Sequence, residues 1–128
     1  MKIPKSKLSK NSLKERVIVV TGAGSGIGRA LSFELAKNNA DLILLSRDQI
    51  KLDSLQDEIK EKFRIDPLTV EFDFLKAKEK DYDFLIENFI DNYTKIDGLV
   101  HVAGVLGYLS PFTSTSPSQL ETVMKVNF

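Results

Sequence analysis

The 128-residue sequence contains no cysteine and a single histidine. Without cysteine the chain can form neither a disulfide nor a thiolate metal site, and one histidine cannot supply a histidine cluster. We therefore predict no metal site. The absence of cysteine also fits a reducing compartment, so we expect a cytoplasmic protein.

Long hydrophobic runs are missing as well. The longest, near residues 17 to 20 and 42 to 45, are far shorter than the roughly 20 residues that cross a bilayer. Residues 1–14 are rich in lysine but contain no apolar block, so they do not form a secretory signal. We interpret them as a basic flexible leader. Such an arm can touch nucleic acid or anionic lipid, but this one has no aromatic residue and no amphipathic period, so we expect neither partner.

What remains, residues 15–128, has the size of one domain. The sequence as a whole is 42% hydrophobic and 28% charged, the proportions of a soluble globular protein with a core of its own. The formal net charge of zero is unevenly distributed, because the basic leader leaves the rest of the chain acidic.

The chain is organised around residues 16–30. Val17 to Val20 form a β-branched run that is too short for a helix and typical of a strand buried on both faces. Glycines follow at once: Gly22, Gly24, Gly26 and Gly28. After them come helix formers with an apolar face. Unpaired N–H groups at a helix start carry partial positive charge, so strand, glycine loop and helix together predict a phosphate site.

The spacing of these glycines narrows the prediction. Neither G-x-G-x-x-G nor G-x-x-x-x-G-K-[ST] is present, whereas T-G-x-x-x-G-I-G runs from Thr21 to Gly28. This pattern resembles the cofactor loop of the short-chain dehydrogenase/reductase family. The alternative is a glycine turn with a purely structural purpose. The resemblance implies that a nicotinamide dinucleotide is held by Thr21, Gly22, Gly24, Ser25, Gly26, Ile27 and Gly28.

The remaining patterns alternate between strands and helices. Apolar runs predict strands, and residues recurring at helical spacing predict helices. In chain order the expected elements are a buried strand at 41–46, a helix at 49–63, a strand at 68–74, a helix at 82–93, a buried strand at 99–105 and a helix from 116 onward. Strands that alternate with helices predict an α/β fold with a doubly wound, Rossmann-type parallel sheet. We expect the strand order 3-2-1-4, incomplete on its C-terminal side.

The end of the second strand indicates the cofactor. An acidic residue there binds the 2′-hydroxyl of NAD, while an arginine accommodates the 2′-phosphate of NADP. Within the resemblance, Ser46 stands where NAD-preferring members carry the acid, and Arg47 stands where NADP-preferring members carry a base. We therefore expect NADP(H) rather than NAD(H). Two alternatives stay open: Arg47 is an ordinary surface residue, or Asp48 takes the ribose role.

Two further segments match the family in part. Asp73, followed by Phe74, matches an aspartate that lies beside the adenine ring, although a loop or helix-capping acid is equally common at a strand end. Ala103 and Gly104 match the second half of the family's N-N-A-G motif. His101 and Val102 replace the two asparagines, so the bonds that tie this strand to its neighbour are in question. We expect His101 to lie within the strand and to be a packed side chain rather than a base or ligand.

The last predicted helix opens with a capping box, from Ser116 through a first-position proline to Gln119. Its predicted buried stripe is Leu120, Val123, Met124 and Phe128, and helical spacing places Asn127 on or beside that stripe. In the family, an asparagine in a V-N context on this helix belongs to the catalytic tetrad and helps to position a water in a proton relay. The resemblance assigns that role to Asn127.

The sequence ends at Phe128, inside this helix and without a stop signal, so it looks truncated. The family's chemistry needs a serine and a Y-x-x-x-K pair, which none of the three tyrosines provides. We therefore expect the cofactor-binding N-terminal half of an NADP(H)-dependent short-chain oxidoreductase. The resemblance implies a small-molecule alcohol or carbonyl substrate and a homo-oligomeric full-length form. The alternative is a non-catalytic NADP-binding sensor or fragment.

Overall fold

Strand β1, Val17–Thr21, lies inside a parallel sheet and is buried along its whole length. The computed structural model describes residues 11–104 and 114–128. β1 pairs on one side with β2, Asp41–Ser46, and on the other with β4, Gly98–His101. β3, Leu68–Glu71, pairs with the outer side of β2. The resulting order, β3-β2-β1-β4, confirms the predicted parallel α/β topology.

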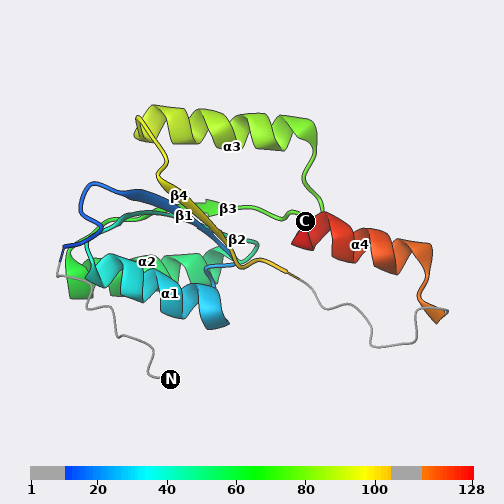
Figure 1. The fold of residues 1–128 in the computed structure, drawn as a ribbon, viewed down its shortest axis with the longest axis horizontal. Helices are drawn as coiled ribbons and strands as arrows, with labels where there is room; N and C mark the ends of the chain where they lie inside the picture. The colour runs from blue at the N-terminus through cyan, green and yellow to red at the C-terminus, as the bar shows by residue number, and fades with distance from the viewer. Residues whose placement is uncertain (1–10, 105–113) are drawn as a thin grey trace, which may run out of the picture.

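The helices lie on both faces of this sheet (Figure 1). α1, Gly26–Lys37, and α2, Gln49–Phe63, cover one face, and α3, Glu79–Asn92, lies over the other. α4, Pro117–Asn127, lies to the side of the sheet. α1 and α2 connect the strands in the direction from β1 to β3, whereas α3 leads back across the sheet from β3 to β4. Because parallel crossovers are right-handed, this reversal of direction places α3 on the opposite face.

The side chains of β1 and β2 alternate between two apolar clusters. On the α1 and α2 face, Val20 and Leu44 pack with Leu52 and Leu55 of α2, and all four side chains are fully buried. The second cluster, on the α3 face, joins β1 and β2 to Leu85 of α3. Burying one such aliphatic side chain contributes about 1.5–3 kcal/mol, so the core fixes the register of the two central strands.

Asp97 ties the start of β4 to the start of β1. One of its carboxylate oxygens accepts the backbone N–H of Val17 at 2.8 Å, and Lys95 and Arg16 also contact the carboxylate. The Val17 N–H bond and then the Lys95 contact hold the pKa of Asp97 below its usual range. This contact lies at the end of the sheet opposite to the carboxyl ends of the strands.

Strand β3 is shorter than predicted. It ends at Glu71, not at residue 74, although the Phe72 N–H still donates to the Ser46 carbonyl at 2.8 Å. The chain then turns, because an Asp73 carboxylate oxygen accepts the Leu75 N–H at 2.9 Å. Such side-chain turns compete with the strand ladder, so the apolar residues that follow Glu71 do not extend the strand.

The prediction of a buried fourth strand was wrong. β4 ends at His101, and 66% of the Leu99 side chain is exposed. Among the described residues β4 pairs with β1 alone, so it is an edge strand. His101 therefore lies at the carboxyl end of the strand and not within it. The expected stripe on α4 is also not buried, since no α4 residue is buried and Leu120 and Met124 are about half exposed.

The leader lies mostly outside the described part, which omits residues 1–10. At its end, Leu13 packs against the α1 and α2 cluster, and its N–H donates to the Asn38 carbonyl at 3.1 Å. Of the helices in the described residues, none is long and apolar enough to cross a bilayer.

Candidate functional site

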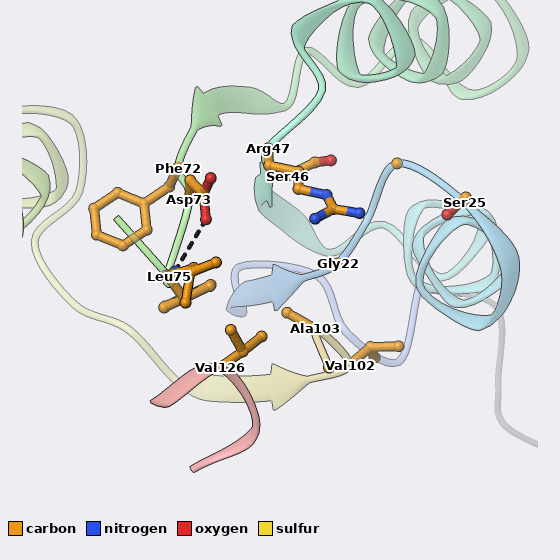
Figure 2. Close-up of a pocket in the computed structure, with 13 residues that line it drawn as sticks. Gly22, Ser25, Ser46, Arg47, Phe72, Asp73, Leu75, Val102, Ala103 and Val126 are labelled. Atoms are coloured by element: carbon orange, nitrogen blue, oxygen red, sulfur yellow. Dashed lines mark hydrogen bonds between the residues drawn. The ribbon is translucent and has the colours of Figure 1, made fainter. Parts of the chain in front are cut away.

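A pocket opens where the carboxyl ends of the parallel strands meet (Figure 2). In open α/β sheets this edge is the usual position of a ligand site. The lining comes from the loops that follow β1, β2, β3 and β4, and from the end of α4. The residues are Gly22, Gly24, Ser25, Ser46, Arg47, Phe72, Asp73, Phe74, Leu75, Val102, Ala103, Gly104 and Val126.

The glycine loop forms one wall of the pocket. Gly22 adopts φ +67°, a left-handed conformation that favours glycine. A Cβ on Gly22 would lie 2.7 Å from the Ala103 nitrogen and 2.9 Å from its Cα, so only glycine permits this approach of the two loops. The Ala23 N–H donates to the Leu45 carbonyl at 3.1 Å and fixes the loop against β2.

The loop leads directly into α1, whose N-cap is Ser25. The Ser25 side chain makes no capping bond, and the first turn of α1 contains no acidic residue. The first N–H groups of the helix are therefore not satisfied by the N-cap side chain, as suits an anion site. Of the other residues predicted to hold the cofactor, Gly26, Ile27 and Gly28 lie in this turn and outside the pocket lining.

Thr21 also lies outside the pocket lining, but its hydroxyl forms hydrogen bonds with two residues of the lining. It is buried, and its Oγ1 accepts the N–H groups of Val102 at 3.1 Å and Ala103 at 3.2 Å. The same oxygen lies 2.8 Å from Nδ1 of His101. These bonds connect β1 to the end of β4 although the two family asparagines are absent.

The segment after β2 forms the opposite wall. Asp48 is the N-cap of α2, where its carboxylate accepts the Lys51 N–H at 3.2 Å. Ser46 Oγ accepts the Asp48 N–H at 3.2 Å. The Arg47 side chain extends into the pocket (Figure 2). Within residues 11–104 and 114–128, no ion pair holds its guanidinium.

The loop after β3 places an acid and aromatic rings beside the pocket. Asp73 lines the pocket and at the same time makes the turn bond to Leu75 that ends β3. Phe74 packs edge-to-face against Phe72, with 5.0 Å between ring centroids, and against His101 at 5.7 Å. Asp73 thus has the structural role of a loop acid in a position where a ligand can reach it.

Gly104 and Asn127 meet at the end of the site. The Asn127 Oδ1 lies 2.9 Å from the position that a Cβ on Gly104 would take, so the glycine allows the amide to approach the β4 loop. Val126, its neighbour on α4, lines the pocket, whereas Asn127 is not part of the lining. The structure therefore places Asn127 beside the site and next to a loop predicted to contact the cofactor.

Sequence reasoning missed several lining residues, namely Phe72, Leu75, Val102 and Val126. Each is directly adjacent in sequence to a residue that was predicted, so its position in the chain was the available signal. Apolar residue type alone does not separate such wall residues from the core. The described part of the chain brings together no cluster of three His, Asp or Glu side chains suited to a metal ion.

Comparison with known proteins assigns the family. A family model described as short chain dehydrogenase matches residues 16–128. The chain belongs to the short-chain dehydrogenase family. Over 115 residues it is 35% identical to the uncharacterized oxidoreductase YciK of Escherichia coli K12, covering 90% of this chain and 46% of that protein.

Solved structures of family members agree with this fold. The 0.95 Å structure of the oxidoreductase YciK from E. coli superimposes with a TM-score of 0.91 at 32% identity, covering 96% of this chain and 50% of that one. A short-chain dehydrogenase from E. coli CFT073 complexed with NADPH gives a TM-score of 0.88 at 34% identity, covering 92% and 49%. The chain thus spans about half the length of these family members.

Proposed function

We propose that this chain is the cofactor-binding part of an NADP(H)-dependent short-chain oxidoreductase that acts on a small-molecule alcohol or carbonyl compound. The observation that carries the proposal is the pocket in which the Arg47 side chain, which has no ion pair within the described residues, faces a glycine loop at the start of a helix. A cytoplasmic location and a homo-oligomeric full-length protein belong to the same proposal.

The residues present fit a nicotinamide dinucleotide. The close approach of Gly22 and Ala103 leaves backbone without side-chain bulk on that wall. The start of α1 offers N–H groups and a favourable dipole to a pyrophosphate. Phe74 and Leu75 supply an apolar wall, and Asp73 supplies a hydrogen-bond acceptor, which together suit an adenine ring.

Three residues at and after the end of β2 favour NADP(H) over NAD(H). Asp48, the candidate ribose acid, already serves as the N-cap of α2. The side chain at the end of β2 is the small, neutral Ser46, and Arg47 next to it can pair with a 2′-phosphate. The NADPH complex of the related E. coli CFT073 protein supports the same choice.

When bound, the nicotinamide supplies or accepts the hydride, and the residues of this chain bind and orient the cofactor. Ala103 and Gly104 leave room above the strand ends, and Val126 limits that space from the side of α4. We assign Asn127 the family's role of positioning a water in the proton relay. This assignment rests on the Val126-Asn127 match and on the position of the amide beside Gly104.

Charge reversal at Arg47 tests the proposal. In the full chain, Arg47→Asp should weaken NADPH binding by about 10- to 150-fold, because a charge-assisted contact contributes about 1.5–3 kcal/mol. NADH binding should change much less. The matched control is Lys80→Asp, an exposed charge reversal in the first turn of α3 and outside the pocket lining.

Titration calorimetry with both cofactors provides the measurement. An equal loss of NADPH and NADH affinity in Arg47→Asp contradicts the assignment of NADP(H). Failure of the unmodified, folded chain to bind either cofactor contradicts the proposed function itself.

A further inference from the structure

The buried hydroxyl of Thr21 has three hydrogen-bond neighbours. The N–H groups of Val102 and Ala103 point at Oγ1 from 3.1 and 3.2 Å, and Nδ1 of His101 lies 2.8 Å away. A hydroxyl oxygen has two acceptor positions and one hydrogen to donate. The two backbone N–H groups occupy the acceptor positions, so the hydroxyl hydrogen is directed to His101.

This arrangement determines the form of the imidazole. Nδ1 accepts the hydroxyl hydrogen and therefore carries no proton itself, which leaves the proton of the neutral ring on Nε2. The ring is also held from a second side, because Phe74 contacts it edge-to-face with 5.7 Å between centroids. The side chain is exposed on its remaining side, yet its orientation is fixed by two contacts.

The hydrogen bonds of Thr21 also affect the pocket, because they hold the backbone of the β4 loop. The Ala103 N–H donates to the Thr21 hydroxyl oxygen at 3.2 Å, whereas the Val102 N–H is shared between this oxygen and the Thr21 backbone carbonyl at 3.3 Å. The acceptor positions of the hydroxyl oxygen face the β4 loop while its hydrogen points at His101. Ala103 is also the residue whose backbone approaches Gly22 most closely. Holding Ala103 thus holds the contact between the β4 loop and the glycine loop.

We propose that His101 is a positioning residue for the cofactor site: it orients the Thr21 hydroxyl and thereby fixes Ala103 against Gly22. This inference rests on the proposed cofactor-binding function. His101 acts through Thr21 and the loop backbone, and it is not part of the pocket lining.

Two amide substitutions separate this role from general packing. His101→Asn places its amide oxygen where Nδ1 of the imidazole stands, so it can still accept the Thr21 hydrogen. His101→Gln carries the same polar group one carbon further out, in the place of Nε2, and cannot make that bond in the same position. A position that merely needs a polar, exposed side chain does not distinguish the two variants.

We expect His101→Gln to weaken NADPH binding by about 2- to 10-fold, the effect of about one neutral hydrogen bond. His101→Asn should remain within about twofold of the unmodified chain. In a Thr21→Val background, the difference between the Asn and Gln variants should disappear, because the two residues act as one unit. Thermal unfolding followed by circular dichroism checks that each variant is folded.

The tautomer gives a readout on the unmodified chain that does not depend on any variant folding. Since His101 is the only histidine in the sequence, selective ¹⁵N-histidine labelling gives one pair of ring resonances. Long-range ¹H–¹⁵N correlation at a pH where the ring is neutral should show Nδ1 as the unprotonated nitrogen. A population of the Nδ1–H form overturns the inference.

The outcomes distinguish this inference from the proposed function. If the unmodified chain binds neither cofactor, the proposed function fails, and the tautomer still reports on the Thr21 bond. If it binds NADPH and the Asn and Gln variants bind equally well, His101 is not a positioning residue, and the proposed function is untouched.

Discussion

Replacing Gly22 by alanine should destabilise the fold more than the same change at Gly26. Both glycines have positive φ, +67° and +55°. An L-residue in that region costs roughly 1–2 kcal/mol in either position. A Cβ on Gly22 would also lie within 3.0 Å of three backbone atoms of Val102 and Ala103, whereas a Cβ on Gly26 meets nothing within 4 Å.

The difference between the two variants isolates the contact between the loops. Backbone atoms cannot rotate away like the end of a flexible side chain, so the added methyl should cost a further 1–3 kcal/mol or so, as in an overpacked core. We expect Gly22→Ala to lose about 2–5 kcal/mol and Gly26→Ala about 1–2 kcal/mol. The loss of unfolded-state entropy is the same for each Gly→Ala change and cancels.

Urea unfolding followed by far-UV circular dichroism measures these free energies, and it suits a chain without tryptophan. Gly98→Ala is the matched control, because Gly98 lacks positive φ and its Cβ would make only an ordinary 3.8 Å contact with Ile18. Losses for Gly22→Ala and Gly26→Ala that agree within about 0.5 kcal/mol would refute the proposed close approach.

Two further predictions concern contacts outside the pocket. Because the pKa of Asp97 is lowered in the folded chain, its stabilising effect is fully present above the ordinary carboxyl pKa and is lost as the pH falls through the lowered value. The stability advantage over Asp97→Asn should therefore shrink in acid unfolding curves below about pH 4, and a constant advantage down to pH 2 or so contradicts the cause given. Ser116→Ala removes the acceptor of the Gln119 N–H bond and should destabilise α4 by about 1 kcal/mol. Hydrogen exchange in the first turn of α4 measures this loss, and exposed Ser114→Ala, which should have little effect, is the control.

Several elements of the fold were predictable because their sequence signals are local. The strand at Asp41–Ser46 and the helix at Gln49–Phe63 have the predicted bounds. Leu52, Leu55 and Ile59 recur at helical spacing, and all three are fully buried. The capping box at Ser116 also forms as predicted, with both of its reciprocal bonds. Each of these features depends on residues within one or two helical turns of each other.

The later strands were less predictable because their ends depend on contacts that the pattern does not encode. β3 stops early because the Asp73 side chain bonds the Leu75 N–H, and an acid in that place is equally compatible with a longer strand. The apolar run of β4 is the same whether one neighbouring strand or two lie beside it. Leu99 is therefore exposed although its sequence context predicts burial.

The residues of the site also differ in whether a local sequence pattern predicts them. The glycine loop, Ser46, Arg47, Asp73, Phe74, Ala103 and Gly104 follow from the motifs, and the structure places them on one pocket, Thr21 and the first turn of α1 excepted. The bond between Thr21 and His101 joins residues 80 positions apart, and no local pattern predicts it. Together with the Val102 and Ala103 N–H bonds to Thr21, it joins β1 to the end of β4.

The unequal packing of the helices has a consequence for ligand binding. α2 contributes three fully buried side chains to the core, whereas α4 has no buried residue, although Val126 of α4 lines the pocket. Local unfolding should therefore cost little free energy at α4 and nearly the full global value at β1 and α2. A ligand that contacts Val126 as well as the glycine loop binds only the ordered form of α4. Its binding energy then shifts the helix toward order by mass action, so the apparent affinity includes the cost of ordering α4.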